Sequence, residues 1–181
     1  IYWWAYSEAP ALGVEDCLIP QKYLDQLRSV HASRRDDTYP LSSFMDLFYT
    51  DHPDLHFLDL QQDSDRATLT HVLMLKALQR PDLLRYLPAR ALTRALQADE
   101  TGHTPLARFA EQLGTCALSV PLDQDAYAAA LRQMDYDFYS QSFLTRTSEG
   151  HRLHAAAQPV PDPAEPSVDV QMIGPFEKAS G

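Results

Sequence analysis

The chain has 181 residues, of which 45% are hydrophobic and 22% are charged, and its formal net charge at pH 7 is −10. This length suits one compact domain, or one domain followed by a tail. The excess of acidic residues argues against a protein that binds nucleic acid or an anionic membrane, because both depend on clustered Lys and Arg. No apolar run approaches the roughly 20 residues that span a bilayer, so we expect no membrane insertion.

Residues 1–35 are expected to form an aromatic segment and a capping helix. Residues 1–6 are so rich in Tyr and Trp that they should be buried, against this domain's own core or against an adjacent domain of the same chain. The chain begins with Ile and not Met, which favours a fragment or a processed protein. Further on, Pro20 suits a first helical turn. Apolar residues then recur at helical spacing: Tyr23, Leu24, Leu27 and Val30.

The range 36–122 begins with two helical units, each broken at a proline. In the first unit, one apolar helix face is expected, formed by Leu41, Phe44, Met45 and Phe48. The residue before Pro53 disfavours helix, and a short second helix is predicted with Leu55 and Leu58. In the second unit, the polar residues 63–68 are expected to form a loop before a helix. That helix carries Leu69, Val72, Leu73 and Leu75, and a short helix with Leu83, Leu84 and Leu87 follows Pro81.

The last third of the chain divides into two parts. Residues 123–154 are expected to form C-terminal capping helices, the first capped by Asp123 or Asp125. Its apolar side is predicted to consist of Tyr127, Leu131, Met134 and Phe138. Residues 155–181 carry four closely spaced prolines and should form an extended tail. The apolar residues 170–176 in that tail suggest a short docking strand, a plug or a linear motif.

Two internal alignments indicate a repeating architecture. Pro53, Asp54 and Leu55 match Pro81, Asp82 and Leu83 at an offset of 28 residues, and residues 63–68 match residues 99–104 at an offset of 36. Two helices per unit at roughly 30-residue spacing are typical of a helical solenoid. An irregular helical bundle with coincidental matches is the alternative.

The segment 99–114 resembles an ankyrin repeat, whose motif is Thr-Pro-Leu-His-x-Ala. Thr104, Pro105 and Leu106 match its first three positions, Gly102 fits the turn before them, and Ala107 replaces the His. These residue types also suit a turn that leads into a helix, because the Thr side chain can form a hydrogen bond within the turn and Pro suits the first helical position. The preceding unit keeps the His as His71, which in this family can tie one loop to the next.

The resemblance implies an all-α fold, a helix-turn-helix solenoid of degenerate ankyrin-like repeats over residues 36–122 with irregular helical ends. Degenerate arrays of this kind occur in bacterial effector proteins. By that analogy the chain would have a virulence role and a cytoplasmic location, either in its own cell or after delivery into a host cell.

The residues do not indicate a reaction. His52 and His56 are four apart, but Pro53 lies between them, so no metal site is expected. Cys17 has acidic neighbours, which lower the nucleophilicity of a thiol, and Cys116 lies in an apolar run. Both cysteines are therefore interpreted as buried. Paired carboxylates are abundant without a dyad pattern, and no glycine-rich phosphate loop is present. We therefore predict no catalytic residue, no cofactor and no metal.

The leading hypothesis is a module that binds another, unidentified protein through stacked helices and the loops at one edge of successive units. The candidate contact residues are exposed and polar: Asp63, Asp65, Arg66, Asp99, Glu100 and His103. One alternative is a non-repeat helical domain of a larger enzyme, with catalysis elsewhere or in this chain. Another is a partner-stabilised helical protein such as a chaperone or immunity protein.

Overall fold

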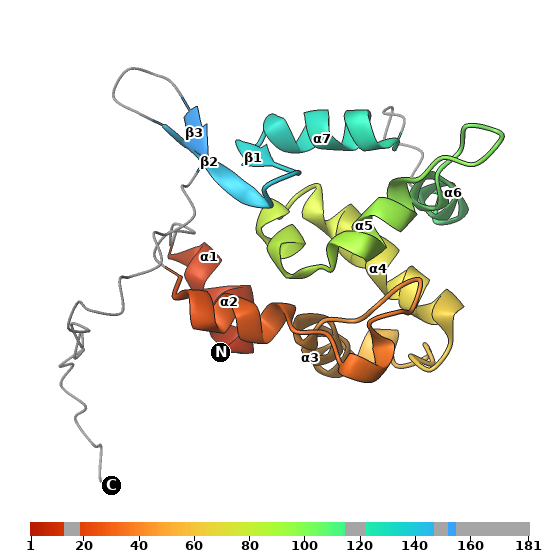
Figure 1. The fold of residues 1–181 in the computed structure, drawn as a ribbon, viewed down its shortest axis with the longest axis horizontal. Coiled ribbons are helices and arrows are strands. Elements are labelled where there is room, and N and C mark those ends of the chain that lie inside the picture. The colour runs from red at the N-terminus through yellow and green to blue at the C-terminus, as the bar shows by residue number, and fades with distance from the viewer. Residues whose placement is uncertain (13–18, 115–121, 147–151, 155–181) are drawn as a thin grey trace, which may run out of the picture.

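A computed structural model describes residues 1–12, 19–114, 122–146 and 152–154 (Figure 1). Within these ranges the chain is mostly helical, as expected, with one small antiparallel sheet. The helices up to α4 are η1 (Trp4–Glu8), α1 (Ala9–Ala11), α2 (Gln21–Arg28), η3 (Ala32–Arg34), α3 (Ser43–Asp51), η4 (Pro53–Leu55) and α4 (Asp63–Ala77). The later helices are η5 (Pro81–Tyr86), α5 (Ala89–Leu96), α6 (Pro105–Gln112) and α7 (Gln124–Arg132).

Helix α4 is the centre of the molecule, and η5, α5 and α6 pack against it. Its inward side chains recur at helical spacing and are fully buried, namely Leu69, Leu73, Met74 and Ala77. The Tyr127 hydroxyl donates a 2.7 Å hydrogen bond to the Met74 carbonyl, which ties α7 to α4. The buried apolar residues from Ala5 to Phe138 form one continuous core.

The first predicted apolar face is confirmed in α3, where Phe44, Met45 and Phe48 have no exposed surface. Ser42 caps this helix by accepting a 3.3 Å hydrogen bond from the Met45 amide, which satisfies a donor that the helix itself leaves unpaired. Asp123, one of the two predicted caps, does the same for α7 through the Ala126 amide at 2.8 Å.

The two internal alignments have different outcomes. Pro53 and Pro81 both open a 3₁₀ helix directly after an α-helix, and Leu55 and Leu83 are buried at equivalent positions. By contrast, the prediction that residues 63–68 form a loop is wrong, because Asp63 is the first residue of α4. Its aligned partner Asp99 lies in a true loop between α5 and α6.

The N-terminal segment, residues 1–12, packs on this domain's own core, the simpler of the two expectations. Ala5 and Ala9 are buried, and Tyr2 and Tyr6 are half-buried against the core. Trp3 points the other way and is 59% exposed. Figure 1 shows this segment beside α2 and α3.

The expected capping helices over residues 123–154 are only partly present. Helix α7 ends at Arg132, and the chain then forms β1 (Tyr136–Asp137), β2 (Ser142–Arg146) and β3 (Arg152–His154) in the order β1-β2-β3. Asp135 has a φ of 61°, a left-handed conformation that cannot continue a helix. Tyr136 is thereby turned into the core, fully buried, beside Phe143 across the strand pair.

Several sequence predictions lie outside the described residues. They concern Cys17, Cys116, the tail at 155–181 and its apolar part at 170–176. Within the residues that the structure describes, no helix combines the length and the apolar character that a bilayer crossing requires.

Candidate binding surface

The loop at residues 97–104 projects from the helical body between α5 and α6 (Figure 1). Asp99 organises this loop. Its Oδ1 accepts hydrogen bonds from the Thr101 amide at 2.8 Å, the Thr101 hydroxyl at 2.6 Å and the His103 amide at 3.2 Å. Its Oδ2 pairs with Arg108 of α6. One carboxylate therefore fixes the loop and joins it to the helix that follows.

The same contacts explain the acidity of Asp99. The hydrogen bond from the Thr101 hydroxyl contributes most, the two backbone amides and the Arg108 guanidinium add to it, and together they lower the pKa of Asp99 to about 2. Hydrogen bonds to the charged form of a carboxyl favour that form. The loop therefore carries its negative charge throughout the physiological pH range.

The turn into α6 forms as the sequence predicts. Gly102 has a φ of +80°, which favours glycine because a Cβ strains the left-handed region. Thr104 caps α6 by accepting a 3.1 Å hydrogen bond from the Ala107 amide, and Pro105 occupies the first turn. The buried Thr104 hydroxyl also donates to the Leu122 carbonyl at 2.8 Å. The motif that resembles ankyrin therefore anchors the base of the loop.

Two of the candidate residues occupy the outer part of this loop. Glu100 is exposed, and it makes no hydrogen bond or ion pair among the described residues. His103 is also exposed, with its Nδ1 3.2 Å from the Thr101 hydroxyl. These two side chains are directed to solvent on a backbone that Asp99 holds in place.

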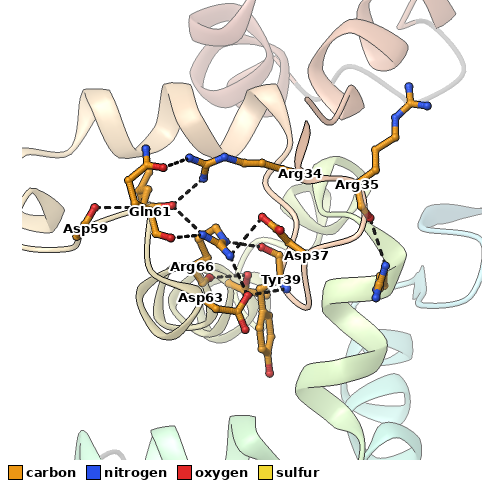
Figure 2. A network of polar contacts seen from close by, with 11 residues as sticks. Arg34, Arg35, Asp37, Tyr39, Asp59, Gln61, Asp63 and Arg66 are labelled. Atoms are coloured by element: carbon orange, nitrogen blue, oxygen red, sulfur yellow. Dashed lines mark hydrogen bonds and ion pairs between the residues drawn. The ribbon is translucent and has the colours of Figure 1, made fainter. Parts of the chain in front are cut away.

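The three candidates at the start of α4 have a different environment, and Figure 2 shows two of them, Asp63 and Arg66. Arg66 was expected to be an exposed contact residue, but it is only 6% exposed. Its guanidinium donates to backbone carbonyls of Tyr39, Leu60 and Gln61 at 3.1, 3.0 and 2.9 Å. It also pairs with the carboxylates of Asp63 at 3.0 Å and Asp37 at 3.2 Å.

Arg66 is buried because its environment compensates the charge. A buried guanidinium is tolerated only when its donors are bonded and its charge is paired. Here the acceptors come from two loops, one before α3 and one before α4, so Arg66 joins both loops to α4. Arg34 reinforces the second loop, donating to the Leu60 carbonyl at 2.7 Å and to the Gln61 side chain at 2.8 Å (Figure 2).

The two acidic residues beside Arg66 also have internal partners. Asp63 accepts from the Tyr39 amide at 3.4 Å in addition to pairing with Arg66. Asp65 accepts from the Asp59 amide at 2.7 Å and from the Ser64 hydroxyl at 3.2 Å. These contacts stabilise the loops around α4. Of the six candidates, Glu100 and His103 are therefore the two whose side chains are available to contact a partner.

The sequence reasoning missed Arg34, Asp37 and Tyr39, which complete this network. None of these residues belongs to a recognisable sequence motif. Tyr39 takes part through its backbone amide and carbonyl. Their partners lie more than 20 residues away along the chain, so no local pattern could have indicated them.

The histidines do not form a metal site in the described part of the chain. His52 Nδ1 lies 2.8 Å from the Phe48 carbonyl, and His56 Nε2 lies 3.0 Å from the Tyr49 carbonyl. His71 does not tie one loop to the next as the resemblance implied. Its ring packs between Tyr39 and Phe109, and its buried Nε2 has no hydrogen-bond partner. Among the described residues, no group of three or more His, Cys, Asp or Glu could hold a metal ion.

Comparisons with known proteins give no relative. No family model matches the chain, and neither a curated protein nor a solved structure matches it.

Proposed function

We propose that this chain is a protein-binding module and that the loop at residues 97–104 is its contact surface. The observation that supports this most is the organisation of that loop by Asp99, which makes four contacts within the loop and to α6. A segment that is already ordered before binding avoids part of the entropy cost of forming a complex. Glu100 and His103 are then presented to solvent on a fixed backbone.

The partner that suits this loop is a protein with a basic surface. The net charge of the chain is −10, and long-range attraction between opposite charges accelerates the encounter of two proteins. The Asp99 charge is already paired with Arg108. Glu100 therefore supplies the acidic group that is available to a Lys or Arg of the partner.

We also propose that α3–η4 and α4–η5 are two degenerate units of an ankyrin-like array. The shared proline at the start of each 3₁₀ helix and the buried leucines at equivalent positions support this. The loop at 97–104 would then correspond to the projecting loop of a third unit. Such loops are a common binding surface in stacked repeats.

Site-specific photocrosslinking can identify the partner. A photoreactive phenylalanine analogue is placed at position 100 of the full-length chain, and at position 111 as a control, in the native host. The crosslinked protein is identified by mass spectrometry, purified and titrated calorimetrically with the two variants Glu100→Lys and Glu111→Lys. Both variants change the net charge equally, and Glu111 is an exposed residue near the end of α6.

We expect Glu100→Lys to weaken binding at least tenfold and Glu111→Lys to change it less than twofold. Lys at position 111 is compatible with α6, because a cation is favourable near the C-terminus of a helix. Equal affinities of the two variants for the protein crosslinked at position 100 would contradict the proposal. A partner that crosslinks equally from both positions would do so as well.

A further inference from the structure

The N-terminal segment is attached to the core by a pair of stacked tyrosines. Tyr2 and Tyr6 are one helical turn apart, and their rings are parallel with centroids 5.7 Å apart. Tyr2 packs on Phe44 at 5.4 Å, and Tyr6 packs edge-on against Phe48 at 5.6 Å. Contacts of this kind between aromatic rings are directional as well as apolar, so they fix where the segment lies along α3.

Arg80 fixes the segment through its backbone. Its Nη2 donates a 2.7 Å hydrogen bond to the Tyr6 carbonyl, and its guanidinium lies 4.8 Å from the centre of the Tyr6 ring. Asp82 pairs with the same guanidinium at 2.7 Å and so orients it. One arginine thus recognises both the ring and the backbone of the same residue, which a Lys cannot do with the same geometry.

The hydroxyl groups of both tyrosines also have polar neighbours. The Tyr6 hydroxyl lies 3.4 Å from His52 Nε2, and the Tyr2 hydroxyl lies 3.5 Å from an Asp51 carboxylate oxygen. His52 Nδ1 is 2.8 Å from the Phe48 carbonyl, so Nδ1 carries the hydrogen and Nε2 accepts from Tyr6. Polar acceptors at both hydroxyls favour tyrosine over phenylalanine at both positions.

Within the part of the chain that the structure describes, the segment is held from one side. Its other side exposes Ile1 at 51%, Trp3 at 59% and Leu12 at 72%, and the two tyrosines are themselves only half-buried. The buried residues of the segment are small, Ala5 and Ala9. The segment therefore lies on the outside of the helical body and covers the rings of Phe44 and Phe48, and its own Ala5 belongs to the core. Beneath it, Phe44 is stacked on Tyr86 at 4.5 Å.

We propose that this aromatic face, formed by Phe44, Phe48, Asp51, His52 and Arg80, is a docking site for a helical peptide with two tyrosines four residues apart. The N-terminal segment is its occupant within the chain, and the same segment supplied separately exchanges with it. The site is distinct from the loop at 97–104, so it stands whether or not that loop binds a partner.

The experiment uses a full-length acceptor in which Tyr2→Ala and Tyr6→Ala weaken the internal occupant. The probe is a dye-labelled peptide with the sequence of residues 1–12, and fluorescence anisotropy measures its binding. We expect saturable binding to this acceptor and at least tenfold weaker binding to the wild-type chain. In the wild type, the tethered segment competes at a high effective concentration.

Peptide variants separate docking from nonspecific apolar adhesion. A Tyr6→Ala peptide should bind at least tenfold more weakly, whereas a Trp3→Ala peptide should bind within twofold of the original because Trp3 faces solvent. Equal binding of these two peptides would overturn the proposal. So would the absence of binding to an acceptor that retains the far-ultraviolet circular dichroism of the wild type.

A second measurement uses the intact chain, in case the acceptor fails to fold. Trp3 and Trp4 are the only two tryptophans in the sequence, so tryptophan emission reports on this segment alone. Arg80→Lys keeps a cation beside Asp82 but removes the guanidinium from Tyr6. We expect the emission to shift towards that of the free peptide and acrylamide quenching to increase. Unchanged emission and quenching would overturn the proposal.

Discussion

His71 should make the stability of the fold depend on pH in a way that one substitution removes. The ring is buried on α4 between Tyr39 and Phe109, and its Nε2 has no hydrogen-bond partner. Burial lowers the pKa of His71 from 6.5 to about 4. The folded protein therefore keeps this ring neutral at pH values where the unfolded chain already binds a proton.

The sign and size of the effect follow from that difference in pKa. Between pH 6.5 and pH 4 the unfolded state binds more protons at this site, so the free energy of unfolding falls as the pH falls. Each unit of pKa difference corresponds to about 1.4 kcal/mol. For the values of 6.5 and about 4, the loss is about 2 kcal/mol between pH 7 and pH 5 and about 3 kcal/mol by pH 4.

The variant His71→Phe keeps an aromatic ring in this position and removes the ionisable group. Its larger ring can impose a packing cost, but that cost does not depend on pH and cancels in the comparison. Urea unfolding is followed by circular dichroism at pH 7, 6 and 5. Between pH 7 and pH 5 the free energy of unfolding should fall by about 2 kcal/mol more in the wild type than in the variant. Carboxyl groups titrate in both proteins and do not affect this difference. Equal losses in the two proteins would refute the reasoning.

Two other predictions concern the network around α4 and the start of α6. Arg66→Lys retains the charge but cannot reach the three carbonyls and two carboxylates that Arg66 contacts, and it should destabilise the fold by about 3 kcal/mol in urea unfolding. A loss of unfolding free energy below about 1 kcal/mol would contradict the stabilising role given to the Arg66 network. Thr104→Val removes both the helix cap and the hydrogen bond to Leu122, and should lower the unfolding free energy by about 2 kcal/mol. Thr93→Val, which makes the same change at an exposed position of α5, is the control, and equal losses of unfolding free energy in the two variants would contradict the role given to Thr104.

The sequence predicts best where local chemistry determines local structure. The apolar spacing of Phe44, Met45 and Phe48 predicts the buried face of α3, and the Thr104–Pro105 pair predicts the start of α6. Asp123 is correctly predicted as a cap. These features depend on residues within one or two helical turns of each other, which is the range over which periodicity and capping rules operate.

The predictions fail where distant backbone atoms decide the outcome. Residues 63–68 look like a polar loop, but Asp63 and Asp65 accept from the Tyr39 and Asp59 amides, and α4 begins at Asp63. Arg66 looks exposed in the sequence because three of its acceptors are backbone carbonyls, which have no sequence signature. The apolar spacing from Tyr127 to Phe138 suits a helix, yet α7 ends at Arg132 and the left-handed Asp135 directly precedes strand β1.

The central claim divides the six candidate residues into two groups. Asp63, Asp65, Arg66 and Asp99 stabilise the fold and its loops, and the loop residues Glu100 and His103 contact a partner. The most direct test measures both properties on the same two variants, Arg66→Lys and Glu100→Lys, against the partner found by crosslinking. Arg66→Lys should lose stability and, at a temperature where it is folded, bind with wild-type affinity. Glu100→Lys should keep wild-type stability and bind at least tenfold more weakly. Weak binding by folded Arg66→Lys together with wild-type binding by Glu100→Lys would contradict the account.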